Sequence, residues 1–323
     1  MERMVASRLN FFLIGAPKAG TTLLHARLSR HPEVYLSPLK EPNHYATDIR
    51  PAQFSQAFKA NLPADLDGYL ADVPLKPRQV SFVQDGAQYS ALFDGANDQH
   101  SIVGECSTSY LWSKLAAKNV AQSHPQAKVL VVLRHPVERL HSHWLMARKY
   151  GFTQLPLLEA VERDCAHPNP GWGSNELFVE AGLYAAGLER WLAAFPRDQV
   201  RVLLSEELDD ADTWRNLAEW MGVEGPIPEV GAEAGNPAGR ARWQRLNAWL
   251  THTGLKSHLS RLVPAAYKSR LSKAWYTEGG LDALTAADRA VLMKHFEADI
   301  LATQTLLGRD LGHWFAASDH RHF

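Results

Sequence analysis

Short apolar runs alternate along the chain with longer segments whose apolar residues recur at helical spacing. Runs with the length and residue types of β-strands occur at residues 11–14, 34–36, 101–105, 128–133 and 200–204. The fourth run, Lys-Val-Leu-Val-Val-Leu, is nearly continuous and rich in valine, which is typical of a central strand in a parallel sheet covered on both faces. The pattern therefore predicts an α/β fold with a P-loop-like parallel sheet flanked by helices.

Helical periodicity follows most of these runs. It predicts a helix that opens at Thr21 and ends before Pro32, and further helices at residues 88–96, 136–150, 180–195 and 214–221. Between residues 48 and 99, prolines and glycines divide the chain into short helices and loops. Residues 222–239 are rich in Gly, Pro and Ala and are predicted to be flexible, whereas the chain after Ala241 is predicted to be mostly helical. We expect a single domain over residues 1–323 with a helical C-terminal part.

A glycine-bounded loop, Gly15-Ala16-Pro17-Lys18-Ala19-Gly20, joins the first strand to the first helix. A loop in this position directs backbone N–H groups and a helix N-terminus at a bound phosphate. Its two glycines have the spacing of the nucleotide-triphosphate P-loop, but Thr21 stands where that motif has its lysine. The lysine instead lies inside the loop, at Lys18. This difference predicts a phosphate-binding loop in an enzyme that transfers a group other than the phosphoryl group of a nucleoside triphosphate.

Other polar residues follow the ends of predicted strands. Lys40 and Glu41 come just after the second strand, where they can reach a group bound at the loop. Arg134 leaves the fourth strand at its carboxyl end, which is the edge where ligands bind in open α/β sheets. Ser142 lies on the helix that begins at Pro136, roughly 9 Å further along its axis.

Composition narrows the class of protein. The chain has 323 residues, 46% of them hydrophobic, and a net charge of -1, so it can bury a full core and no general surface for nucleic acid is indicated. Two cysteines, Cys106 and Cys165, are too few for a disulfide framework or a zinc site and favour a reducing compartment. The N-terminal segment lacks the apolar core of an export signal, and no run approaches the roughly 18 apolar residues of a membrane span. We therefore expect a cytoplasmic protein; the sequence does not indicate its oligomeric state.

Several motifs together resemble the sulfotransferases that use 3′-phosphoadenosine 5′-phosphosulfate (PAPS). They are Pro17-Lys18-Ala19-Gly20-Thr21-Thr22, Lys40-Glu41-Pro42, Gly104-Glu105-Cys106-Ser107 with Tyr110-Leu111, and residues 129–142, 182–195 and 307–311. These motifs cover most of the chain in order. They are more similar to the bacterial and heparan-sulfate branch of the family than to the cytosolic phenol branch.

The resemblance implies an enzyme that moves a sulfuryl group from PAPS to a hydroxyl or amine of an acceptor, a saccharide or a small metabolite. The products are the sulfated acceptor and adenosine 3′,5′-bisphosphate (PAP), and no metal is required. The residues implied in binding the 5′-phosphosulfate are Lys18, Ala19, Gly20, Thr21 and Thr22. Arg134 and Ser142 are implied in binding the 3′-phosphate. Arg240 is a candidate to cover that phosphate, although the start of a solvated helix is the other interpretation.

The resemblance also implies catalytic roles. A cation at Lys18 stabilises the charge that develops on the leaving phosphate. Glu41 matches the position of the general base in the heparan-sulfate branch, and His44 is the alternative. That branch often has Lys where Cys106 stands, and its pattern after Lys-Glu differs from the Asn-His-Tyr-Ala found here. The acceptor, and whether it is sulfated on oxygen or nitrogen, is therefore left open.

Two other functions remain as alternatives. A P-loop nucleotide or small-molecule kinase is disfavoured by Thr21 in place of the motif lysine and by the lack of an evident Asp-bearing strand for magnesium. A nucleotide-binding adaptor without catalysis would make the presence of Lys18 together with Glu41 a coincidence. His135, His141 and His143 lack the i, i+4 spacing of a zinc helix, so we expect structural or surface roles for them.

Overall fold

The computed structural model describes residues 8–62, 65–79, 81–231, 239–241, 276–278 and 283–316. They belong to two compact units. The first unit is drawn from residues 1–51, 62–134 and 190–236, and the second from residues 52–61, 135–189 and 237–323. The expectation of a single domain stays a prediction.

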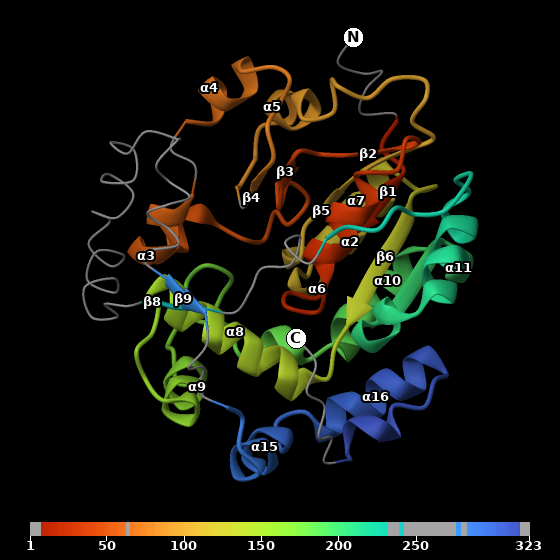
Figure 1. Cartoon of the computed structure of the whole chain (residues 1–323). Coiled ribbons are helices and arrows are strands. Elements are labelled where there is room, and N and C mark those ends of the chain that lie inside the picture. Colours follow the sequence, from red (N-terminus) through yellow and green to blue (C-terminus); the bar gives the residue numbers. More distant parts are fainter. Residues whose placement is uncertain are drawn as a thin grey trace. The chain divides into compact units, whose positions relative to one another are not determined.

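A parallel sheet of five strands forms the centre of the first unit (Figure 1). Its order is β2-β5-β1-β6-β7, and every neighbouring pair is parallel. The strands are β1 (Phe11–Leu13), β2 (Val34–Leu36), β5 (Ile102–Cys106), β6 (Lys128–Leu133) and β7 (Val200–Leu204). Each lies where the apolar runs predicted it, and β1, β5 and β6 are almost completely buried. The prediction of an α/β fold with a parallel sheet flanked by helices is confirmed.

Helices in the first unit bury apolar faces. They are α2 (Thr21–Leu28), α4 (Leu66–Ala71), α5 (Gly86–Ala91), α6 (Ser109–Trp112), α7 (Ala116–Ser123) and α11 (Ala211–Met221). In α11 the buried residues Trp214, Leu217 and Met221 recur at intervals of three and four, and Gly222 ends the helix at φ 75°. A second parallel pair joins β3 (Leu39–Lys40) to β4 (Arg78–Gln79). Short 3-10 turns of this unit are η3 (Arg197–Gln199) and η4 (Ser205–Asp209), and η1 (Pro51–Gln53) begins here and continues into the second unit.

The second unit is largely helical in its described part. Its elements are α3 (Gln56–Asn61), α8 (Pro136–Tyr150), α9 (Leu157–Cys165), η2 (Glu180–Gly182), α15 (Ala286–Met293), α16 (Glu297–Leu307) and η6 (Gly312–Trp314). Two short strands, β8 (Gly239–Ala241) and β9 (Tyr276–Glu278), pair antiparallel. Helix α8 has its predicted bounds, because Pro136 occupies its first turn and Gly151 ends it at φ 87°. Helix α10 (Ala185–Ala194) begins in this unit and ends in the first.

Several predicted helices differ from the structure at their ends; the one predicted at 214–221, for example, starts at Ala211. The helix predicted at 88–96 is α5, which starts at Gly86 because the Asp85 side chain caps it by accepting from the Gln88 N–H. The helix predicted at 180–195 is divided into η2 and α10. The Asp299 carboxylate accepts from the N–H groups of Tyr184 and Ala185 and so fixes the later start of α10. Tyr184 is buried in the core.

Other predictions fall partly outside the described residues. These include the segment 222–239, of which residues 232–238 lie outside, and most of the chain between residues 242 and 282. In the part of the chain that the structure describes, no helix is both long enough and apolar enough to cross a membrane.

Candidate active site

The loop that carries Lys18 is tied to the neighbouring strand β6. The N–H groups of Ile14 and Ala16 donate to carbonyl oxygens of β6 at 3.0 and 2.7 Å. The backbone then passes through left-handed conformations, with φ 67° at Lys18 and φ 111° at Gly20. Gly20 is the N-cap of α2 and provides no side-chain cap, so the N–H groups of the first helical turn are not covered by a capping side chain. This arrangement suits an anion at the N-terminus of α2.

Arg134 lies directly after β6 and reaches the same loop. Its Nη1 donates to the backbone oxygen of Lys18 at 3.3 Å. The guanidinium therefore lies at the carboxyl edge of the sheet, beside the residue predicted to contact the transferred group. The structure thus brings together Lys18 and Arg134, which are 116 positions apart in the sequence.

Glu41 is held in place by a buried ion pair and by Thr108. The Lys40 Nζ lies 3.0 Å from Glu41 Oε1, and both side chains are buried. The N–H and the hydroxyl of Thr108 also donate to the Glu41 carboxylate, each at 2.9 Å. Burial lowers the pKa of Lys40, but the neighbouring Cys106 and Glu41 outweigh burial and place that pKa above its usual value. Lys40 is therefore charged near neutral pH.

Cys106 ends β5 beside this pair. Its side chain is fully buried, and burial raises the pKa of the thiol to about 12, although the positive charge of Lys40 acts in the opposite direction. Lys40 thus supplies a buried cation next to the position where the heparan-sulfate branch often has a lysine.

His44, the alternative base, has a different environment. Its Nδ1–H donates to the Val83 carbonyl at 2.9 Å, and its ring stacks on Tyr89 with centroids 4.1 Å apart. Burial lowers the pKa of His44, which favours the neutral imidazole. In that form, with Nδ1 as the donor, Nε2 is a proton acceptor.

The sequence analysis did not identify Glu105 as a site residue. Its carboxylate is completely buried in β5 and accepts hydrogen bonds from Tyr89, Ser107 and Tyr110. The available signal in the sequence was a charged residue inside an otherwise apolar strand. A buried charged side chain is rarely left without a partner.

Two predicted donor-binding residues lie in the second unit. Ser142 is half-buried on α8. Arg240 lies in β8, where only the backbone is described. Their proposed contacts with a 3′-phosphate therefore stay predictions.

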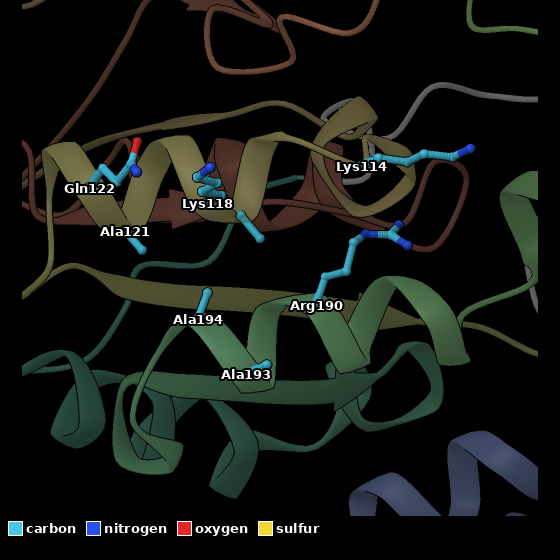
Figure 2. Close-up of a pocket in the computed structure, with 8 residues that line it drawn as sticks. Lys114, Lys118, Ala121, Gln122, Arg190, Ala193 and Ala194 are labelled. Carbon is cyan, nitrogen blue, oxygen red and sulfur yellow. The ribbon is translucent and has the colours of Figure 1, made fainter.

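A groove lies between α7 and α10 in the first unit (Figure 2). It has a volume of about 490 Å³ and is lined by Lys114, Lys118, Gln122, Arg190 and the methyl groups of four alanines. Lys114 and Arg190 lie at one end and Gln122 at the other. Arg190 donates to the carbonyl oxygens that end α6, at 3.1 and 3.2 Å. No predicted site residue lines this groove.

The described residues include no cluster of three or more His, Cys, Asp or Glu side chains suited to a metal ion. His135 has a structural role, because its Nδ1 accepts from the Val137 N–H at the start of α8.

Comparison with known proteins shows which family the chain resembles. A sulfotransferase family model matches residues 10–168, a segment that contains β1, the Lys18 loop, the Lys40–Glu41 pair and β6 with Arg134. This segment, about half of the chain, is similar to the sulfotransferase family. The matched segment includes residues of both compact units.

Sulfotransferases are also found among similar proteins and solved structures. Carbohydrate sulfotransferase 15 from Rattus norvegicus is 28% identical over 232 residues, which cover 61% of this chain and 40% of that protein. The human bifunctional heparan sulfate N-deacetylase/N-sulfotransferase 2 is 25% identical over 231 residues, covering 66% of this chain and 22% of that protein. The chain therefore spans less than half the length of these relatives. The crystal structure of a sulfotransferase from Alicyclobacillus acidocaldarius is 25% identical, covers 95% of this chain and 99% of its own, and has a TM-score of 0.66.

Proposed function

We propose that this protein is a PAPS-dependent sulfotransferase that transfers a sulfuryl group to a hydroxyl or amine of an acceptor and releases PAP. The main support is the contact of Arg134 with the Lys18 loop. This contact brings the Arg134 guanidinium to the loop that carries Lys18, which supports binding of the 5′-phosphosulfate and the 3′-phosphate of one nucleotide near the N-terminus of α2. The carbohydrate and heparan sulfate relatives support a saccharide as the acceptor, with a small metabolite as the other candidate class.

In the proposed reaction, an oxygen or nitrogen of the acceptor forms a bond to sulfur while the bond from sulfur to the bridging oxygen breaks. The electron pair of that bond stays on the phosphate of PAP. Lys18 and the N–H groups at the start of α2 stabilise the charge that develops there. Glu41 or His44 accepts the acceptor's proton. No residue role in this scheme calls for a bound metal, because the transferred group carries less negative charge than a phosphoryl group.

We also propose a cytoplasmic location. Cys106 and Cys165 both have free thiols, which supports a reducing compartment.

Calorimetric titration of PAP and 5′-AMP tests the donor assignment. We expect PAP to bind at least about tenfold more tightly, because a charge-assisted bond to the 3′-phosphate contributes roughly 1.5–3 kcal/mol. Arg134→Ala should remove most of this preference, and Arg134→Lys should keep part of it because only the two-pronged geometry is lost. Arg30→Ala is a matched control, since Arg30 is exposed and donates to the Glu229 carbonyl.

Equal affinity of the wild-type protein for PAP and 5′-AMP would contradict the proposal. Magnesium-dependent transfer of phosphate from ATP would favour the P-loop kinase instead. Transfer of radiolabelled sulfate from PAPS to a panel of saccharides and small alcohols or amines, with magnesium chelated, then identifies the acceptor class.

A further inference from the structure

Glu105 is the centre of a buried hydrogen-bond network in the first unit. Its side chain is inaccessible to solvent in the middle of the parallel sheet. The hydroxyl groups of Tyr89 and Tyr110 each donate to Oε1 at 2.7 Å, and that of Ser107 donates to Oε2 at 2.5 Å. A buried carboxylate with three donors is stabilised in its ionised form, which only accepts hydrogen bonds.

Two of these hydroxyl groups also bind the backbone of the loop that follows β3. Ser107 Oγ accepts from the Asn43 N–H, and the Tyr110 hydroxyl accepts from the Tyr45 N–H, both at 3.0 Å. Each hydroxyl has one hydrogen and donates it to Glu105, so the direction of both series of hydrogen bonds is fixed. They run from the loop amides through the hydroxyls to the carboxylate.

The loop itself has an unusual backbone. Glu41 has φ 64° and Asn43 has φ 56°, in the left-handed region that side-chain-bearing residues rarely adopt. Such conformations persist only where surrounding contacts hold them. The Asn43 side chain contributes by donating to the carbonyl oxygens of Glu41 and Ser81, at 2.7 and 2.8 Å. The Glu105 network provides the contacts to the loop N–H groups.

The third donor connects Glu105 to the alternative base. Tyr89 stacks its ring on His44 while its hydroxyl is bound to Glu105. The loop that carries Glu41 is held through its N–H groups, and the His44 ring is held by stacking on Tyr89. Both sets of contacts lead to the Glu105 carboxylate.

We propose that Glu105 is a positioning residue that fixes the loop carrying both candidate bases, Glu41 and His44. It acts through the hydroxyl groups of Ser107, Tyr110 and Tyr89. The role rests on the proposed function, since it assumes that one of these bases accepts the acceptor's proton. Glu105 itself contacts neither substrate.

Electrostatics gives this role a pH dependence. Burial raises the pKa of Glu105 to about 7, the three hydroxyl groups act against this shift, and the charge of Glu41 adds to it. The titratable groups that interact with it are Tyr89 from α5, Tyr110 from α6, Cys106 from β5 itself, and Glu41 and Tyr45 from the loop. Protonation below about pH 7 places an O–H where the network requires an acceptor. The ordered loop, and turnover with it, should decline as the pH falls through this range.

Glu105→Gln tests the role, with amide hydrogen exchange at Asn43 and Tyr45 as a readout that does not depend on activity. We expect exchange at both amides to accelerate at least about tenfold. The kcat should fall by roughly 10²-fold, the scale of a misplacement of about 1 Å, while affinity for PAP stays unchanged. The acidic limb of the kcat profile near pH 7 should disappear in this variant.

Further variants separate positioning from a general loss of structure. Ser107→Ala should accelerate exchange at Asn43 and leave Tyr45 protected. Tyr35→Phe is the control, because it removes a tyrosine hydroxyl bound to the Leu92 carbonyl and lies outside the network. It should alter neither amide.

Unchanged exchange at Asn43 and Tyr45 in Glu105→Gln would overturn the proposal. A second test adds Glu105→Gln to a double variant with Glu41→Gln and His44→Ala. A residue that acts through the bases should have little effect once both bases are removed. If Glu105→Gln still lowers the residual rate by its full factor, the proposal is also overturned. Failure of the proposed function would instead appear in the wild type, as equal affinity for PAP and 5′-AMP, and would leave the exchange results standing.

Discussion

Glu41 and His44 differ in how their proton-accepting atoms are occupied. The Glu41 carboxylate already accepts from Lys40 and from the N–H and hydroxyl of Thr108. His44 donates from Nδ1 to Val83, and burial lowers its pKa, so Nε2 can accept a proton near pH 7. The family resemblance favours Glu41 as the general base. The hydrogen bonds that the Glu41 carboxylate already accepts favour His44 instead.

Replacing each residue in turn decides between them. Removal of the true base should lower kcat by roughly 10²–10⁴-fold and leave the PAP affinity nearly intact, because the base acts on the acceptor's proton. We expect this result for Glu41→Gln, measured by steady-state kinetics and PAP titration. Glu159→Gln, on the exposed face of α9, controls for the loss of a carboxylate. If His44→Ala abolishes turnover and Glu41→Gln does not, the two roles are exchanged.

The start of α2 depends on the backbone of Gly20. Its φ of 111° and ψ of 4° lie outside the region that residues with a Cβ adopt readily, and a Cβ there would lie 2.7 Å from Leu208 Cδ1. Leu208 can move away, since the close atom is the end of a flexible side chain. The dihedral strain cannot be relieved without moving the phosphate loop.

Gly20→Ala should therefore destabilise the protein by about 1–3 kcal/mol and weaken PAP binding. Gly86→Ala is the matched control: Gly86 opens α5 in the same unit, and a Cβ there meets no atom within 4 Å. That change should be neutral or stabilise by up to about 1 kcal/mol, because alanine restricts the unfolded chain. Urea unfolding of both variants measures the difference; equal stabilities would show that the strain at Gly20 is relieved locally.

Elements with strong local signals were predicted best. The strand at 128–133 and the helix at 136–150 have the predicted bounds, because valine-rich sequence, Pro136 and Gly151 act over a few residues. The start of α10 could not be predicted in the same way. It depends on Asp299, which is more than a hundred positions away in the sequence.

The same distinction applies to the site. The Lys18 loop could be located from its glycine spacing, and Arg134 from its position at a strand end. The network around Glu105 could not, since Tyr89, Ser107 and Tyr110 become its partners only when α5, β5 and α6 are packed together. The left-handed backbone of Glu41 likewise has no local signal in the sequence.

Across the chain, buried titratable groups make stability depend on pH in opposing directions. Burial lowers the pKa of His25, His124 and His135 to about 4, so the unfolded chain binds more protons at these residues than the folded one between about pH 6.5 and 4. Their contribution to stability is complete above pH 6.5 and is lost as the pH falls towards 4. Glu105 acts the other way, because its pKa of about 7 makes the folded state bind the extra proton down to about pH 4.5.

Since the lowered pKa values of the three histidines outweigh the raised pKa of Glu105, the free energy of unfolding should decrease on acidification from pH 7 to 4.5. In Glu105→Gln the opposing contribution is gone, so the decrease should be steeper. Urea unfolding at intervals of half a pH unit, followed by tryptophan fluorescence, measures both slopes. Parallel curves for the variant and the wild type would show that Glu105 keeps an ordinary pKa in the folded state.

The two free thiols are divided between the units. Cys106 lies in the central sheet of the first unit, with no accessible surface and a pKa raised to about 12, whereas Cys165 is exposed at the end of α9 in the second unit. Because the thiolate is the reactive form, an alkylating reagent will label Cys165 in the native protein and Cys106 only when the sheet opens. The ratio of the two labels, read by mass spectrometry, thus reports how often the first unit opens, with Cys165 as the internal reference and no engineered probe.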